Sequence, residues 1–289
     1  MKSVTKVKRS DRTELEEESL PERIANYVLA RRNEDGGYTS VQFIESNIYD
    51  TFLALAILKE INVEPPNVEQ TINFLKSFPL LDLRSIYYVN KSLEILRQPL
   101  IDATEFIVSI RNKDGGFGTL NVDIESSSEL ETTFMAIDLL KMLDKTINDK
   151  ERTIEFVLNL KNPDGGFGKS LNSNIVSTYY ALSALSLLEY DVEKLEETKR
   201  YVTSCESEMG GFTPKPLAEP PFIEYTYFGV MALKFFKLKP KSTAKTTSFV
   251  LSCLNSNGGF RRSSEHGISS FEYTYYAISV LKELGVSII

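Results

Sequence analysis

Acidic side chains recur at one position of a repeated sequence pattern. The pattern is a threonine followed by an aromatic residue, and its pairs begin at Thr51, Thr133, Thr178, Thr226 and Thr274. A glutamate stands two residues before three of these threonines, at Glu131, Glu224 and Glu272. Grouped carboxylates can bind a hard divalent cation, and a carboxyl kept protonated by an apolar pocket can act as an acid. Acids are also favoured at helix N-termini by capping and by the helix dipole, so a structural role is the alternative.

These acids can act together only if the segments that carry them share one end of the fold. A glycine-glycine-aromatic turn occurs five times, at residues 36–38, 115–117, 165–167, 210–212 and 258–260. Successive first glycines lie 79, 50, 45 and 48 residues apart. The long first interval predicts a sixth unit without glycines, between Asn67 and Leu96. A charged amphipathic segment precedes each turn and an almost wholly apolar one follows it, which predicts a helical hairpin in every unit.

The polarity of the second segments favours a closed ring over an open stack. In the fourth unit the first segment, 151–160, has one apolar side, whereas the second, 178–188, carries no charge. The last apolar segment, 274–281, resembles the middle ones, although an open stack needs a polar terminal face. We therefore predict an all-α fold, an (α/α)6 toroid of six helical hairpins with the second helices inside. Residues 21–289 form this single domain, and residues 1–20 are expected to be a mobile charged tail.

In such a ring the six inner helices begin at the same mouth. The position two residues before each threonine-aromatic pair then lines that mouth, and its residues are Tyr49, Arg84, Glu131, Val176, Glu224 and Glu272. The aromatic position itself forms a second column, made of Phe52, Tyr87, Phe134, Tyr179, Tyr227 and Tyr275. Packing alone could explain these rings. If the lumen is open, they are the candidate substrate-binding residues for an apolar ligand.

Composition excludes several classes of protein. The formal net charge of −7 and the absence of a basic patch interleaved with aromatics argue against a nucleic-acid partner. The longest apolar run, around 51–58, is too short to span a bilayer. We therefore expect a cytoplasmic protein with no membrane span.

The fourth unit carries the pattern of a known repeat. Asn162-Pro163-Asp164-Gly165-Gly166-Phe167-Gly168, followed by Ser177-Thr178-Tyr179-Tyr180, resembles the repeat of protein prenyltransferase β subunits and of squalene and other terpenoid cyclases. The resemblance covers residues 22 to 286 and implies a toroid whose apolar cavity takes an isoprenoid chain. It also implies, for a β-like chain, an α-helical partner subunit.

The resemblance further implies a metal site at the mouth. Protein prenyltransferases bind catalytic zinc through an Asp-x-Cys and a histidine, and the matching positions here are Glu224, Thr226 and Glu272. The cysteine and the histidine are both missing. Two carboxylates and a hydroxyl suit Mg²⁺ better than Zn²⁺.

Terpenoid cyclases of the second class protonate an alkene with an Asp-x-Asp-Asp-Thr motif. The segment 47–51 resembles the motif with only its last aspartate, Asp50, and the segment 129–133 resembles it with Glu129 and Glu131 in the first two acid positions. These three acids are the catalytic candidates. The sequence thus indicates a protein that acts on or holds a prenyl diphosphate or a polyprenyl chain, with a non-catalytic carrier or a β-like subunit as the alternative. Whether it is an enzyme stays open.

Overall fold

The computed structural model describes residues 18–120 and 127–288. Within these ranges the regular elements are α-helices, two short 3₁₀ turns and isolated β-bridges, which confirms the all-α prediction. Most of the predicted tail, up to residue 17, lies outside the described residues. In the described part no helix has both the length and the apolar character needed to cross a membrane.

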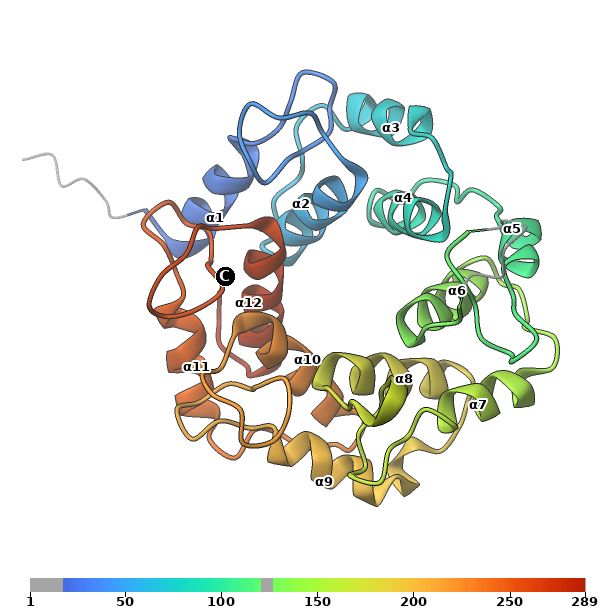
Figure 1. The fold of residues 1–289 in the computed structure, drawn as a ribbon. Coiled ribbons are helices and arrows are strands. Elements are labelled where there is room, and N and C mark those ends of the chain that lie inside the picture. Colours follow the sequence, from blue (N-terminus) through green and yellow to red (C-terminus); the bar gives the residue numbers. More distant parts are fainter. Residues whose placement is uncertain (1–17, 121–126, 289) are drawn as a thin grey trace, which may run out of the picture.

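In residues 18–120 and 127–288, twelve α-helices form two concentric rings (Figure 1). The outer ring consists of α1 (Leu20–Leu29), α3 (Val68–Ser77), α5 (Thr104–Ser109), α7 (Lys150–Leu158), α9 (Glu196–Ser204) and α11 (Thr243–Ser252). The inner ring consists of α2 (Ile48–Glu60), α4 (Leu83–Ile95), α6 (Leu130–Met142), α8 (Ile175–Leu187), α10 (Ile223–Lys234) and α12 (Phe271–Glu283). The 3₁₀ turns are η1 (Lys169–Leu171) and η2 (Val192–Lys194). The six predicted hairpins are present, with the second helix of each inside.

The inner ring is closed. Each inner helix packs against the next one along the chain, and α12 packs against α2, so the last unit contacts the first. The inner helices are apolar on most sides because they bury surface against two inner neighbours and an outer helix. On α8, for example, Ala181, Leu182, Ala184 and Leu185 are all fully buried.

The glycine turns join neighbouring units. Gly36 has a φ of +91°, and a Cβ there would lie 2.6 Å from the backbone of Gln70 in the next outer helix, α3. A Cβ at Gly37 would lie 2.8 Å from the ring of Phe74 in the same helix. Only glycine combines this backbone conformation with so close an approach. The last turn repeats the arrangement, since Gly258 packs against Arg23 of α1 and so closes the outer ring.

The threonine of each threonine-aromatic pair fixes a glycine turn to its inner helix. In the fourth unit the buried hydroxyl of Thr178 accepts a hydrogen bond of 3.0 Å from the backbone N–H of Phe167 and donates one of 2.8 Å to the carbonyl oxygen of Asn174. The turn-to-threonine bond recurs in all five units with glycines, at 3.0 to 3.1 Å. The threonine column is therefore part of the scaffold, and it sets where each inner helix begins.

The unit without glycines is the α3–α4 hairpin, between the predicted limits Asn67 and Leu96. It supplies no glycine turn to the next outer helix, α5, which has only six helical residues. The other outer helices have nine or ten. The junction between the second and third units therefore has the shortest outer helix of the ring and no glycine turn.

Candidate functional site: a tyrosine-lined central cavity

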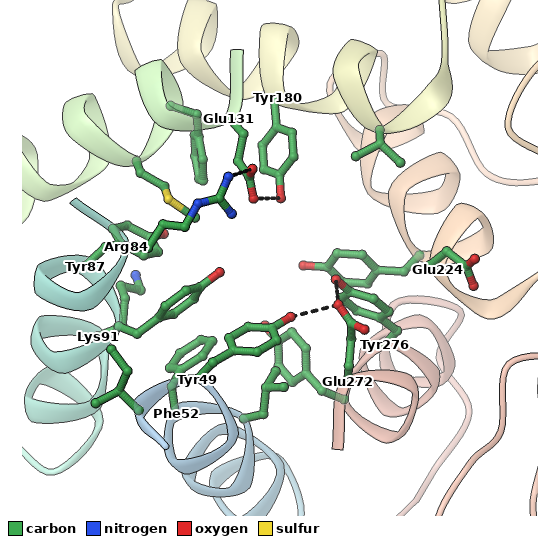
Figure 2. A pocket seen from close by; sticks show the side chains of 18 of the residues that line it. Tyr49, Phe52, Arg84, Tyr87, Lys91, Glu131, Tyr180, Glu224, Glu272 and Tyr276 are labelled. Carbon is green, nitrogen blue, oxygen red and sulfur yellow. Dashed lines mark hydrogen bonds and ion pairs between the residues drawn. The ribbon is translucent and has the colours of Figure 1, made fainter. Parts of the chain in front are cut away.

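The inner ring encloses a cavity of about 1010 Å³. Three positions of every inner helix line it, spaced i, i+3 and i+4, so that one stripe of each helix faces the lumen. The first position is the predicted mouth column from Tyr49 to Glu272, and all six of its members are in the lining. The cavity therefore extends to the N-terminal ends of the inner helices, and Figure 2 shows part of its lining from close by.

The second position is the predicted aromatic column. Its members, Phe52, Tyr87, Phe134, Tyr179, Tyr227 and Tyr275, all line the cavity. Their role in binding a substrate stays a prediction, but their location in the lumen is as the repeat pattern indicates.

The third position was not recognised from the sequence. It contributes Leu53, Tyr88, Met135, Tyr180, Phe228 and Tyr276 to the lining. The sequence contained the information needed to find this position. Each of these residues stands four residues after a member of the mouth column, and positions i and i+4 share a helix face. Together the columns place eight of the fourteen tyrosines of the chain around the cavity, and Tyr273 adds a ninth to the lining.

The rings of neighbouring helices are in contact. Tyr227 of α10 stacks on Tyr276 of α12 with ring centroids 4.4 Å apart, and Tyr49 of α2 lies 4.7 Å from Tyr88 of α4. Burial raises the pKa of Tyr227 and of Tyr276 well above the ordinary value for tyrosine. These tyrosines therefore stay protonated and present O–H donors on an otherwise apolar wall.

One polar cluster at the mouth is centred on Glu131. Its carboxylate forms an ion pair of 2.5 Å with Arg84 and accepts a hydrogen bond of 3.3 Å from the hydroxyl of Tyr180. The side chains of Arg84 and Glu131 are 41% and 25% exposed. A carboxylate held by a guanidinium at this distance serves as an acceptor and counter-ion, a different arrangement from that of an acid kept protonated by an apolar pocket.

A second polar cluster is centred on Glu272. Its Oε1 atom accepts hydrogen bonds of 2.8 Å from Tyr49 and 3.2 Å from Tyr276. Figure 2 shows this cluster and the Glu131 cluster on different sides of the same opening. The pKa of Tyr49 is raised, first by burial and then by the negative charge of Glu272. Two neutral hydroxyls thus hold the Glu272 carboxylate in place.

Glu224 is turned away from the centre of the cavity (Figure 2). Its Oε1 atom pairs with Arg262 at 2.5 Å, and the Arg262 guanidinium also lies 4.2 Å above the ring of Phe222. The other oxygen, Oε2, is buried without a hydrogen-bond partner in the described residues. Arg262 was missed in the sequence because it lies in the loop before α12, outside the helical columns.

A third ion pair lies deeper in the cavity. Asp138 of α6 accepts a hydrogen bond of 2.8 Å from the hydroxyl of Tyr87 and lies 3.5 Å from the Nζ atom of Lys91. The two charged side chains are only 19% and 24% exposed. Lys91 and Asp138 lie two turns beyond the mouth column in α4 and α6, at i+7, so the same helix faces bring them into the lining.

Comparison with known proteins identifies the architecture. The chain matches the model of the prenyltransferase alpha-alpha toroid domain over residues 7–78, 80–221 and 221–288. The chain belongs to this family. Comparison with curated protein sequences gives no significant match.

Solved structures of the prenyltransferase and terpene cyclase type share the toroid. Candida albicans protein geranylgeranyltransferase-I complexed with GGPP superposes with a TM-score of 0.70 and 20% identity, over 82% of this chain and 83% of that one. A variant of the type II terpene cyclase MstE from Scytonema, in complex with geranylgeranyl dihydroxybenzoate, superposes with a TM-score of 0.63 and 10% identity, over 93% of this chain and 97% of that one. The ent-copalyl diphosphate synthase from Streptomyces platensis superposes with a TM-score of 0.53 and 13% identity, over 82% of this chain and 50% of that one. At these identities the likeness shows a common fold.

The acids that resemble the cyclase motif of the toroid family do not come together in this cavity. Asp50 lies outside the lining and accepts hydrogen bonds of 2.8 Å and 2.6 Å from the backbone and hydroxyl of Ser40 and one of 2.9 Å from Asn47. Glu129 is exposed at the N-cap of α6. Of the three, only Glu131 is in the lining. A catalytic role for Asp50 or Glu129 stays a prediction with no geometric support.

The predicted metal ligands do not form a coordination site for the metal that the toroid family implies. Thr226 is fully buried, and its hydroxyl is bonded to the Phe212 N–H at 3.0 Å and to the Phe222 carbonyl at 2.9 Å. Glu224 and Glu272 are held by different partners, as described above. In residues 18–120 and 127–288 no group of three or more His, Cys, Asp or Glu side chains could hold a metal ion. The residues present therefore do not fit a zinc site, and the expected Thr226 ligand is a scaffold residue.

Proposed function

We propose that this toroid binds an isoprenoid chain in its central cavity and acts on it or holds it there. The observation that carries the proposal is the lining, in which thirteen of the 26 residues are phenylalanine or tyrosine. A cavity of about 1010 Å³ lies at the upper end of the usual range for small-molecule sites. Two toroids of the same fold support the choice of ligand, since one is in complex with GGPP and the other with geranylgeranyl dihydroxybenzoate.

The energetics of burial favour a long apolar ligand. Burying a C15 to C20 chain contributes ~0.8 kcal/mol per methylene, on the order of 10 kcal/mol before the cost of ordering the chain is subtracted. The aromatic walls supply this apolar surface on all six sides. Tight binding of the chain therefore does not depend on a metal or on a diphosphate clamp.

Turnover, if it occurs, would depend on the acids that face the lumen. Glu131 and Glu272 are the candidates, because their carboxylates contact hydroxyls inside the cavity. A non-catalytic carrier, or a β-like subunit that becomes active with an α-helical partner, is the alternative. We place the protein in the cytoplasm, and its two buried, unpaired cysteines support a reducing compartment.

Mass spectrometry of products tests the enzymatic form of the proposal. The pure protein is incubated with farnesyl and geranylgeranyl diphosphates, with Mg²⁺ and separately with Zn²⁺. A cyclised product indicates cyclase chemistry, whereas released diphosphate with an alcohol or hydrocarbon indicates ionisation. Untouched substrate that co-purifies with the protein indicates a carrier.

A cavity-filling variant tests the location of the site. Val176 is the small residue of the mouth column, and Val176→Trp should fill the opening and weaken farnesol binding more than tenfold in calorimetry. Val108→Trp is the matched control, because Val108 is 62% exposed on α5 and distant from the lining. Equal affinity of the two variants would move the binding site out of the cavity.

A further inference from the structure

We propose that the cavity selects isoprenoid ligands whose head group is a cation, an alkylammonium, over prenyl diphosphates. The inference rests on the proposed function and adds the chemistry of the head group. It comes from the charges of the lining, the pairing of those charges and the rings that surround one carboxylate.

The lining carries more negative than positive charge. It contains five acidic side chains, Asp82, Glu131, Asp138, Glu224 and Glu272, against three basic ones, Arg84, Lys91 and Arg262. Every basic side chain is already paired with an acid, at 2.5 Å for Arg84 with Glu131, 3.5 Å for Lys91 with Asp138 and 2.5 Å for Arg262 with Glu224. A diphosphate in this cavity would find no unpaired cation, and it would add its own charge to an existing excess of negative charge.

Two acids remain after this pairing, and they differ in their surroundings. Asp82 caps α4, and its Oδ1 atom accepts a hydrogen bond of 2.7 Å from the backbone N–H of Ser85. Glu272 instead faces the lumen and is bound by the hydroxyls of Tyr49 and Tyr276. Glu272 is thus the acid of the lumen whose charge is offset by neutral donors alone.

The two tyrosines that bind this carboxylate belong to a cluster of rings. Tyr49 is in contact with Tyr88, and Tyr276 is stacked on Tyr227, so the negative charge lies at the edge of a cluster of four rings from four helices. The pKa of Tyr88 is raised by burial first, with contributions from the charges of Glu131 and Glu272. A carboxylate next to a cluster of aromatic rings is a combination that binds ammonium groups, through an ion pair and cation–π attraction. The hydrocarbon tail would then extend along the aromatic columns into the lumen.

Three ligands that share a farnesyl tail and differ only in the head group test this preference. Farnesylamine, farnesol and farnesyl diphosphate are titrated into the protein at pH 7, where the amine is protonated, and the dissociation constants are measured by calorimetry. We expect the amine to bind at least tenfold more tightly than the alcohol, and the diphosphate to bind more weakly than both. Tighter binding of the diphosphate, or equal binding of amine and alcohol, would overturn the inference while leaving isoprenoid binding intact. No binding of any of the three would overturn the proposed function as well.

A charge-neutralising pair of variants assigns the effect to Glu272. Glu272→Gln should weaken amine binding about tenfold, or about 1.4 kcal/mol, and should strengthen diphosphate binding. Glu265→Gln removes the same charge from an exposed position of the loop before α12, outside the cavity lining, and it should leave both affinities unchanged. If the two variants behave alike, the preference comes from the overall charge of the protein, and the proposed head-group site is wrong.

Discussion

Tyr49 and Glu272 are 223 residues apart in the sequence and are joined by a hydrogen bond of 2.8 Å. Tyr49 lies in the first turn of α2 and Glu272 in the first turn of α12, so the bond links the first and last units of the ring. On the outside the same two units meet where Gly258 packs on Arg23. The ring is thus closed by a polar contact at the mouth and a backbone contact at its periphery.

Removing the Tyr49 hydroxyl should weaken this closure modestly. Tyr49→Phe keeps the ring contacts with Tyr88 and loses one hydrogen bond to a charged acceptor, which contributes about 1.5 to 3 kcal/mol. Urea unfolding should show a decrease of about that size in the free energy of unfolding. Tyr273→Phe, a neighbouring cavity tyrosine whose hydroxyl donates to no carboxylate in the described part of the chain, is the control and should change stability by less than ~0.5 kcal/mol.

Adding a methyl group at a glycine turn should be strongly destabilising. Gly36→Ala places a Cβ 2.6 Å from the Gln70 backbone in addition to the cost of a positive φ, and we expect a loss of about 3 kcal/mol or more. Gly285 also has a positive φ, +76°, but no atom lies within 4 Å of its Cβ position. Gly285→Ala should therefore cost only about 1 kcal/mol. Similar thermal unfolding of the two variants would show that the inter-unit contact contributes little.

Thr226 should behave as a scaffold residue. Thr226→Val leaves the buried N–H of Phe212 without its acceptor, which should lower the free energy of unfolding by about 1 to 3 kcal/mol. Thr226→Ser keeps the hydroxyl and should recover most of the loss. The melting temperature of all three proteins should be independent of added Mg²⁺. A Mg²⁺-dependent stabilisation that only Thr226→Val abolishes would restore the metal prediction.

The Arg84–Glu131 ion pair should contribute little to stability. Both side chains are partly exposed, and such pairs are usually worth less than about 1 kcal/mol. Glu131→Gln should therefore fold normally, so that any loss of product formation in mass spectrometry reports on chemistry in the cavity. Glu151→Gln, at an exposed position of the outer helix α7, serves as the control. Equal product yields from Glu131→Gln and the parent protein would exclude Glu131 as a catalytic group.

The two buried cysteines should make the folded state less stable at alkaline pH. Burial raises the pKa of Cys205 to about 12 and that of Cys253 to about 11, from an ordinary value near 9. The unfolded chain therefore releases these protons first, and the folded state is fully favoured below pH 9 and loses stability as pH rises from 9 through 12. A Cys205→Ala, Cys253→Ala variant should show a flatter decline over this range in denaturant titrations. Dithionitrobenzoate at pH 8 should label neither thiol until the protein is unfolded.

The sequence was sufficient to predict the fold because each unit repeats its structural signals. The hidden α3–α4 hairpin could be located from the spacing of the glycine turns and from residues that match the other units, and the column from Phe52 to Tyr275 lies in the lumen as expected. The spacing of one helix face determines all of these positions. The sequence therefore identified two of the three columns that surround the cavity.

The partners of the charged residues could not be predicted in the same way. Asp50 belongs to the motif-like segment 47–51 but is bonded to Ser40, a residue of the preceding loop. Arg262, which pairs with Glu224, also lies in a loop with no periodic pattern. Pairing between units depends on loop conformation and side-chain rotamers, and neither is encoded in the repeat period. Glu272 is distinguished by the absence of a basic partner among the described residues of the lining, and this can be recognised only from the ion pairs of the other acids.

Closure of the ring changes how the protein can come apart. In an open stack a terminal unit has one neighbour and can fray without disturbing the rest. Here every unit has two neighbours, so the release of any hairpin requires two junctions to break together, and unfolding becomes more cooperative than in a linear array. The junction at α5 lacks a glycine turn and has the shortest outer helix. It is the place where the ring would first open into a crescent, and amide hydrogens there should exchange ahead of those in the other outer helices.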